Sequence, residues 1–137
     1  MSHKHVFQLS AAIMAMFGLT LLLLPNMLIA MYGGQMMNGP GVYNSMLYGG
    51  VLVAMAVMNW SASNLMLAET RSIVLGNLVA NCLGFIVAIF RQLTDETVPP
   101  TAWLNVAIFL IFVVMFAQLQ RRMKAAAQAL PGVAPAS

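Results

Sequence analysis

Three amides inside otherwise apolar segments, Asn77, Asn81 and Asn105, are the first side chains to consider for chemistry. An amide in hydrocarbon needs a hydrogen-bonding partner, because no water is present to supply one. One interpretation is that these amides line a polar cavity for a ligand. The other, which we favour, is that they bond to neighbouring helices, because amides often cross-link helix bundles and nothing ionisable lies near them.

Sulfur ligands are the second possibility, because the chain has 13 methionines. Thioethers are soft ligands that suit Cu(I). Met27 and Met31 are four residues apart, and His3 and His5 add nitrogen ligands near the N-terminus. Methionine more often fills irregular space in a core. Copper handling is therefore our third choice of function, and we expect no metal site.

The sequence offers little for catalysis, and we expect no enzyme and no cofactor. Cys82 is the one cysteine, which leaves no Cys–His couple, and the apolar segments contain no histidine to ligate haem and no charge to carry ions. Arg91, Asp95 and Glu96 lie together in a hydrophilic stretch, where we expect an exposed ion pair. A basic face for nucleic acid is also missing.

The composition requires a membrane environment for the elements that hold these residues. The chain has 137 residues, of which 61% are apolar and 7% charged, and its mean hydropathy is +0.87. Soluble domains carry about 25% charged residues. We therefore predict an all-α integral membrane protein with the lipid bilayer around it, in the bacterial inner membrane.

The apolar segments predict a four-helix bundle over residues 1–124. A spanning helix needs about 20 residues, which places the four spans at about 6–24, 42–66, 72–90 and 101–119. The Ala- and Pro-rich tail, residues 125–137, has nothing to pack with and is predicted to be mobile. We do not expect the first span to be a cleaved signal peptide, because its apolar run is long and no Ala-x-Ala site follows.

Two further features concern the ends of the spans. Pro25 interrupts the first apolar segment, and the residues after it either continue a kinked helix or lie at the interface before Gly33 and Gly34.

The orientation of the spans follows from the basic residues, because cytoplasmic loops are rich in Lys and Arg. Four spans put all the basic residues except Arg91 on one side, so both termini are predicted to be cytoplasmic; these residues are Lys4, Arg71, Arg121, Arg122 and Lys124.

The third span is predicted to be the central packing helix. Small residues recur at every fourth position, and with Asn77 and Asn81 they share a face about 140° wide; they are Gly76, Ala80, Gly84 and Ala88. Small residues four apart allow another helix to approach closely in lipid. We call this face the small-residue seam and expect it to meet protein.

The fourth span carries a matching aromatic face. Asn105, Phe109, Phe112 and Phe116 fall within about 60° on a helical projection. We predict that these rings cover the small-residue seam of the third span.

The order of these features resembles that of small bacterial four-helix membrane proteins of unknown function, of the DUF4345-like and DoxX-like kind. The matching segments are LLPNMLIAMYG, MLYGGVLVAMAV and LGNLVANCLGFIVAI, followed by a last helix that opens with Trp103 and ends in basic residues. The similarity runs from Leu21 to Arg122. It implies a four-helix fold and carries over no functional residue.

The function that we predict first is therefore a structural or accessory one. The bundle would pack against a larger membrane complex or against itself as a homo-oligomer, because its parts outside the membrane are too short for a soluble domain. The alternative is a binder or carrier of an apolar small molecule, such as a lipid, quinone or pigment, held between the helices and oriented by Asn77, Asn81 or Asn105.

Overall fold

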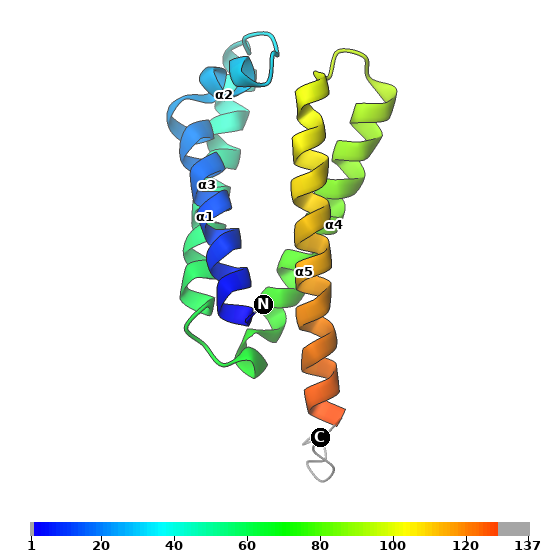
Figure 1. Cartoon of the computed structure of the whole chain (residues 1–137). Helices are drawn as coiled ribbons and strands as arrows, with labels where there is room; N and C mark the ends of the chain where they lie inside the picture. Colours follow the sequence, from blue (N-terminus) through cyan, green and yellow to red (C-terminus); the bar gives the residue numbers. More distant parts are fainter. Residues whose placement is uncertain (1, 129–137) are drawn as a thin grey trace.

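The computed structural model describes residues 2–128, and within them every regular element is a helix (Figure 1). In chain order the elements are α1 (His3–Leu23), α2 (Pro25–Met31), α3 (Gly39–Ala62), the short 3-10 helix η1 (Leu67–Thr70), α4 (Arg71–Thr94), the short 3-10 helix η2 (Pro100–Ala102) and α5 (Trp103–Gln128). Four helical segments of this region are long and apolar enough to cross a membrane. This suggests a multi-pass membrane protein, and the all-helical prediction is confirmed.

The four long helices correspond to the four predicted spans, but their ends differ from the prediction. Helix α3 stops at Ala62, a turn before residue 66, because the Ser63 hydroxyl and the following turn bond back to the carbonyls of the last helical residues. Helix α4 continues past residue 90 to Thr94. Helix α5 also continues, through residues 125–128 of the predicted tail, and residues 129–137 lie outside the described residues.

Pro25 separates two helices and does not merely kink one. Leu24 has φ −140° and ψ 54°, which is not helical, and Pro25 occupies the first turn of α2, where its missing N–H costs nothing. Gly33 follows α2 with a φ of 77°, which a residue with a Cβ rarely adopts. The Asn26 side chain accepts a hydrogen bond from the Met37 backbone N–H at 2.8 Å and ties the following loop to α2.

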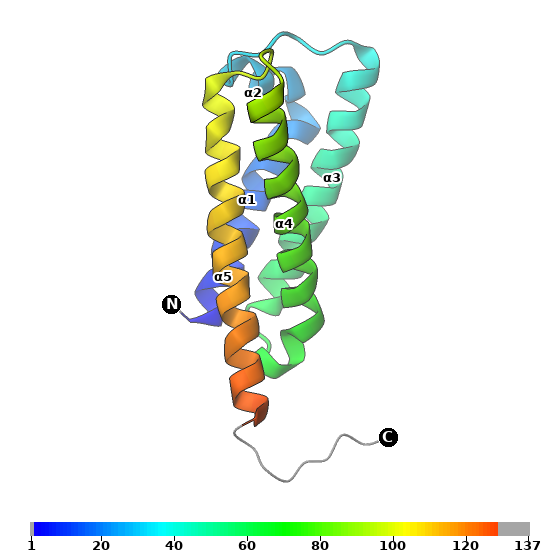
Figure 2. The ribbon, with the colours of Figure 1, turned by 90° about the vertical axis from the view of Figure 1, so that its right-hand side faces the viewer.

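The long helices form two pairs. Helix α1 packs chiefly on α3, and α4 packs chiefly on α5; we call these the N-terminal pair and the C-terminal pair. Figure 1 shows the two pairs as neighbouring columns, and in Figure 2 the C-terminal pair lies in front of α1, with α3 to one side. Gly18 and Gly49 allow the first pair to approach at backbone distance: a Cβ on Gly49 would lie 2.6 Å from the Leu22 nitrogen.

The apolar core that joins the two pairs lies toward one end of the bundle. Its residues come from the start of α1, the end of α3, the start of α4 and the middle of α5; they are Val6, Phe7, Ala62, Val74, Phe112, Phe116 and Leu119. The Phe7 and Phe116 rings meet edge to face, with centroids 5.8 Å apart. This end also carries Lys4, Arg71 and the basic residues of α5, and we call it the basic end. The opposite end, which holds α2, is the α2 end.

The hydrophilic turn after α4 lies at the α2 end and contains the expected ion pair, between Arg91 and Asp95. The Asp95 carboxylate also accepts hydrogen bonds from the hydroxyl and the backbone N–H of Thr97, at 2.6 and 2.9 Å. The Thr97 hydroxyl bond is the largest of the effects that lower the pKa of Asp95. These contacts close the turn and bring α5 back alongside α4.

Candidate functional site

A pair of buried asparagines connects the two helix pairs. Asn59 of α3 and Asn77 of α4 are both 0% exposed. Asn59 Nδ2 donates to Asn77 Oδ1 at 3.0 Å, and Asn77 Nδ2 donates to Asn59 Oδ1 at 2.8 Å. The two amides thus satisfy each other reciprocally across the interface between the N-terminal and C-terminal pairs. We call this contact the Asn59–Asn77 pair.

The remaining polar groups of this region are satisfied within the protein. Asn59 Nδ2 also lies 3.2 Å from the Ser10 hydroxyl of α1, and Asn77 Nδ2 donates to the Ile73 carbonyl at 2.9 Å. Asn81, which is 3% exposed, donates to the Asn77 carbonyl of its own helix at 2.7 Å. The amides are thus used in internal bonds. Asn77 bonds to another helix, whereas the bond from Asn81 Nδ2 stays within α4.

The structure forms only part of the small-residue seam. A Cβ on Gly84 would lie 2.5 Å from Phe109 Cε1, so that ring covers Gly84 closely, and Ala88 is half-buried. Gly76 and Ala80 are instead exposed, and no atom lies within 4 Å of a Cβ built on Gly76. The prediction is corrected for these two residues: α5 covers α4 near Gly84, and within the described part of the chain Gly76 and Ala80 stay exposed.

The aromatic face of α5 divides in the same way. Phe109 packs on Gly84 of α4, as expected. Phe116 contacts Phe7 of α1, and Phe112 lies beside Phe116 in the core at the basic end. These two rings therefore fill the space between the helix pairs and do not continue along the seam, because α5 must pack on α1 as well as on α4.

Asn105, at the α2 end, bonds to a residue outside the long helices. The Tyr32 hydroxyl donates to Asn105 Oδ1 at 3.0 Å, and the Thr101 hydroxyl donates to the Tyr32 carbonyl. Burial raises the pKa of Tyr32, and the hydrogen bond with Asn105 offsets part of that rise. The phenol therefore keeps its proton at neutral pH and links the residues after α2 to α5.

An apolar pocket lies at this end, between the two helix pairs. Its volume is about 570 Å³. Helices α1 and α2 form one side and η2 with α5 forms the other; the lining residues are Met16, Phe17, Thr20, Met27, Leu28, Met31, Tyr32, Thr101 and Leu104. We call it the interpair pocket. It has the size of a small-molecule site.

Sequence reasoning missed three residues that organise this region. Asn59 lies near the polar end of the second predicted span, where only its being an amide inside a span indicates that it needs a partner. Gly18 lies in the first span without the four-residue repeat that marks the third. Tyr32 is far from Asn105 in the sequence, and only the fold after Pro25 places the two side chains together.

The described residues hold no group of three or more His, Cys, Asp or Glu side chains that could bind a metal ion. Three methionines, Met16, Met27 and Met31, do line the interpair pocket. The copper hypothesis stays a prediction.

Comparison of the chain with protein-family models, curated proteins and solved structures gives no match, so the resemblance to the DUF4345-like and DoxX-like kind also stays a prediction.

Proposed function

We propose that this protein is a multi-pass protein of a bacterial inner membrane that binds an apolar small molecule in the interpair pocket. In this proposal both termini lie in the cytoplasm, because the basic end carries all but one of the Lys and Arg residues. The ligand is held between the helix pairs and is not chemically altered.

The interpair pocket is the observation that carries the proposal. Its walls are mainly Met, Leu and Phe side chains, which favour an aliphatic or aromatic ligand. The core residues and the Asn59–Asn77 pair hold the two helix pairs together nearer the basic end. The pocket thus lies at the end of the bundle away from this core, and we expect a ligand to enter it there from the bilayer.

The hydroxyl groups of the pocket indicate which polar group the ligand carries. Thr20 donates its proton to the Met16 carbonyl, Thr101 to the Tyr32 carbonyl and Tyr32 to Asn105. None of the three hydroxyl oxygens accepts a hydrogen bond from another described residue, so each has a lone pair with which to accept one. The pocket therefore favours an apolar molecule with a hydroxyl or other hydrogen-bond donor, such as a quinol or a lipid with a hydroxylated head, over one with carbonyl acceptors alone.

Thr20→Phe is expected to abolish retention of this ligand. The larger ring occupies the pocket from α1, whereas Leu19→Phe changes the neighbouring exposed position, which does not line the pocket. Native mass spectrometry of the detergent-purified full chain measures the retained mass. We expect a lipid-like adduct on the wild type and on Leu19→Phe, and at least about a tenfold lower fraction on Thr20→Phe, which corresponds to about 1.4 kcal/mol.

The control variant Leu19→Phe shows whether the loss of the adduct in Thr20→Phe is specific to the pocket. If Leu19→Phe loses the adduct as fully as Thr20→Phe does, the loss does not depend on the pocket. A wild-type chain that carries no adduct in any mild detergent would also contradict the proposal.

A second role, as an accessory subunit or homo-oligomer, is favoured by the uncovered part of the small-residue seam. Gly76 and Ala80 are exposed on α4 with open space in front of Gly76, and such residues allow close approach of another helix in lipid. The same mass spectra test this role. A partner protein or a multiple of the 14.8 kDa chain supports it, and a bare monomer argues against it.

A further inference from the structure

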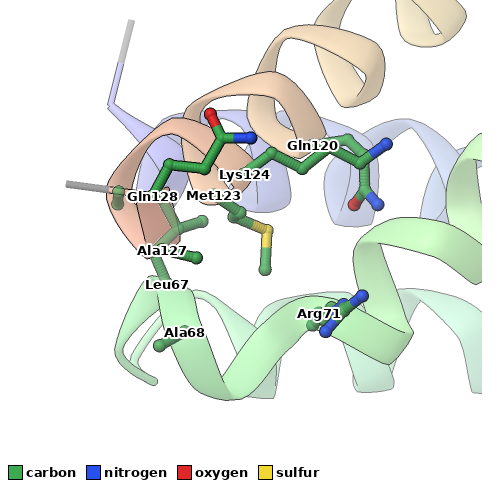
Figure 3. A pocket seen from close by; sticks show the side chains of 9 residues that line it. Leu67, Ala68, Arg71, Gln120, Met123, Lys124, Ala127 and Gln128 are labelled. Carbon is green, nitrogen blue, oxygen red and sulfur yellow. The ribbon is translucent and has the colours of Figure 1, made fainter. Parts of the chain in front are cut away.

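A second pocket lies at the basic end, between η1 with the first turn of α4 on one side and the last turns of α5 on the other. Its volume is about 550 Å³, and Figure 3 shows its lining side chains. Residues from η1 and the first turn of α4 form one wall and the last turns of α5 form the other; they are Leu67, Ala68, Arg71, Gln120, Met123, Lys124, Ala126, Ala127 and Gln128. We call it the basic pocket. It shares no residue with the interpair pocket.

The charge of the basic pocket has one sign. Arg71 and Lys124 contribute cations from two different helices, and none of the described residues that line it is acidic. Glu69, the nearest acid in the sequence, accepts a hydrogen bond from the Met66 backbone N–H at 2.9 Å and helps to cap η1. Two cations facing one pocket from opposite walls, without a carboxylate between them, suit an anion such as a phosphate group.

The uncharged lining distinguishes a lipid phosphate from a free one. Leu67, Met123 and three alanines give the pocket an apolar surface, with which an inorganic anion makes no favourable contact. Gln120 reaches into the pocket from α5 on the side where Arg71 lies (Figure 3), and its side-chain oxygen is buried with no hydrogen-bond partner among residues 2–128. A headgroup hydroxyl would satisfy this oxygen, so the phosphate and the hydroxyl each have a counterpart, and the apolar lining suits the carbon atoms of the headgroup.

We propose that the basic pocket binds the headgroup of an anionic glycerophospholipid, with the phosphate between Arg71 and Lys124 and a headgroup hydroxyl at Gln120. The inference rests on the chain crossing a membrane with its basic end at the surface, where basic pockets between helices recruit anionic lipids. It does not depend on a ligand in the interpair pocket, which is at the other end of the bundle.

The test is lipid retention by the full chain in native mass spectrometry, with phosphatidylglycerol and phosphatidylcholine supplied separately in detergent. We expect selective retention of phosphatidylglycerol. Arg71→Gln and Lys124→Gln should each reduce it about fivefold, the effect of removing one cation near the surface. Lys4→Gln removes a cation of the same end that does not line the pocket, and this variant should retain phosphatidylglycerol as the wild type does.

Three results would overturn the inference. Equal retention of the two lipids would show that the pocket does not distinguish an anionic headgroup from a zwitterionic one. An equal loss in Lys4→Gln would show a general attraction to the basic end. Inorganic phosphate that binds alone and displaces phosphatidylglycerol would identify a free anion as the occupant. A thermal melt of each variant in the same detergent, expected to match the wild type, separates loss of binding from loss of fold.

Discussion

Changing Gly49 to alanine is expected to lower the free energy of unfolding by about 1–3 kcal/mol, the usual cost of overpacking. A Cβ at this position would lie 2.6 Å from the Leu22 nitrogen and 2.7 Å from the Gly18 oxygen. Both are backbone atoms, which cannot rotate away, so α1 and α3 must separate. Titration with sodium dodecyl sulfate in mixed micelles, followed by circular dichroism, measures the change.

The neighbouring glycine provides a matched control, because a Cβ on Gly50 would meet no atom within 4 Å. Gly50→Ala should therefore leave stability unchanged or raise it by up to about 1 kcal/mol, the helix preference of alanine over glycine. Gly84→Ala should fall between the two, since it meets the movable Phe109 ring. Equal stability of the Gly49 and Gly50 variants would contradict the close crossing of α1 and α3.

Changing Asn77 to leucine is expected to cost about 1–3 kcal/mol, because it leaves the Asn59 amide without its reciprocal partner in a buried site. The double variant Asn59→Leu with Asn77→Leu should recover much of this loss, since no amide then remains unpaired. The same denaturant titration measures these two variants and the single variant Asn59→Leu. The coupling between the two positions should be about 0.6–1.7 kcal/mol, the range found for hydrogen bonds between membrane helices.

Asn44→Leu is the control for this series. Asn44 is an exposed asparagine of α3, and its replacement should change stability little. Additive effects of the Asn59 and Asn77 changes, with no recovery in the double variant, would show that the two amides do not act as a pair.

The positions of the long helices were predictable because they depend on properties that the sequence carries locally. Apolar length set the four spans, and Pro25 marked the end of α1. The exact ends were not predictable, because they depend on individual hydrogen bonds. The Ser63 hydroxyl bonds to the Trp60 carbonyl where α3 ends, a turn before the predicted residue. A serine at this position in the sequence does not by itself predict that bond.

The candidate sites were less predictable, because they depend on how the helix pairs sit against each other. The sequence shows that Asn77 needs a partner but not that Asn59 supplies it, since that choice depends on the register of α3 against α4. The coverage of the small-residue seam was equally unpredictable from the sequence. The four-residue spacing identifies a face that another helix can approach closely, but the place where α5 crosses α4 determines that Gly84 is covered and Gly76 is not.

The interpair pocket has no signature in the sequence at all. Its lining comes from α1, α2, η2 and α5, and no spacing within one segment joins Thr20 to Thr101. It exists because the core and the Asn59–Asn77 pair hold the helix pairs together nearer the other end.

Photolabelling of the full chain in bilayers with a diazirine-bearing fatty alcohol tests the proposed ligand site most directly. This probe combines an apolar body with the hydroxyl donor that the pocket favours. The account predicts that adducts concentrate on the peptides that contain Met27–Tyr32 and Thr101–Leu104, and that Thr20→Phe removes them while Leu19→Phe does not. Labelling spread evenly over the exposed apolar faces, including Val57 and Val87, with no effect of Thr20→Phe, would contradict it.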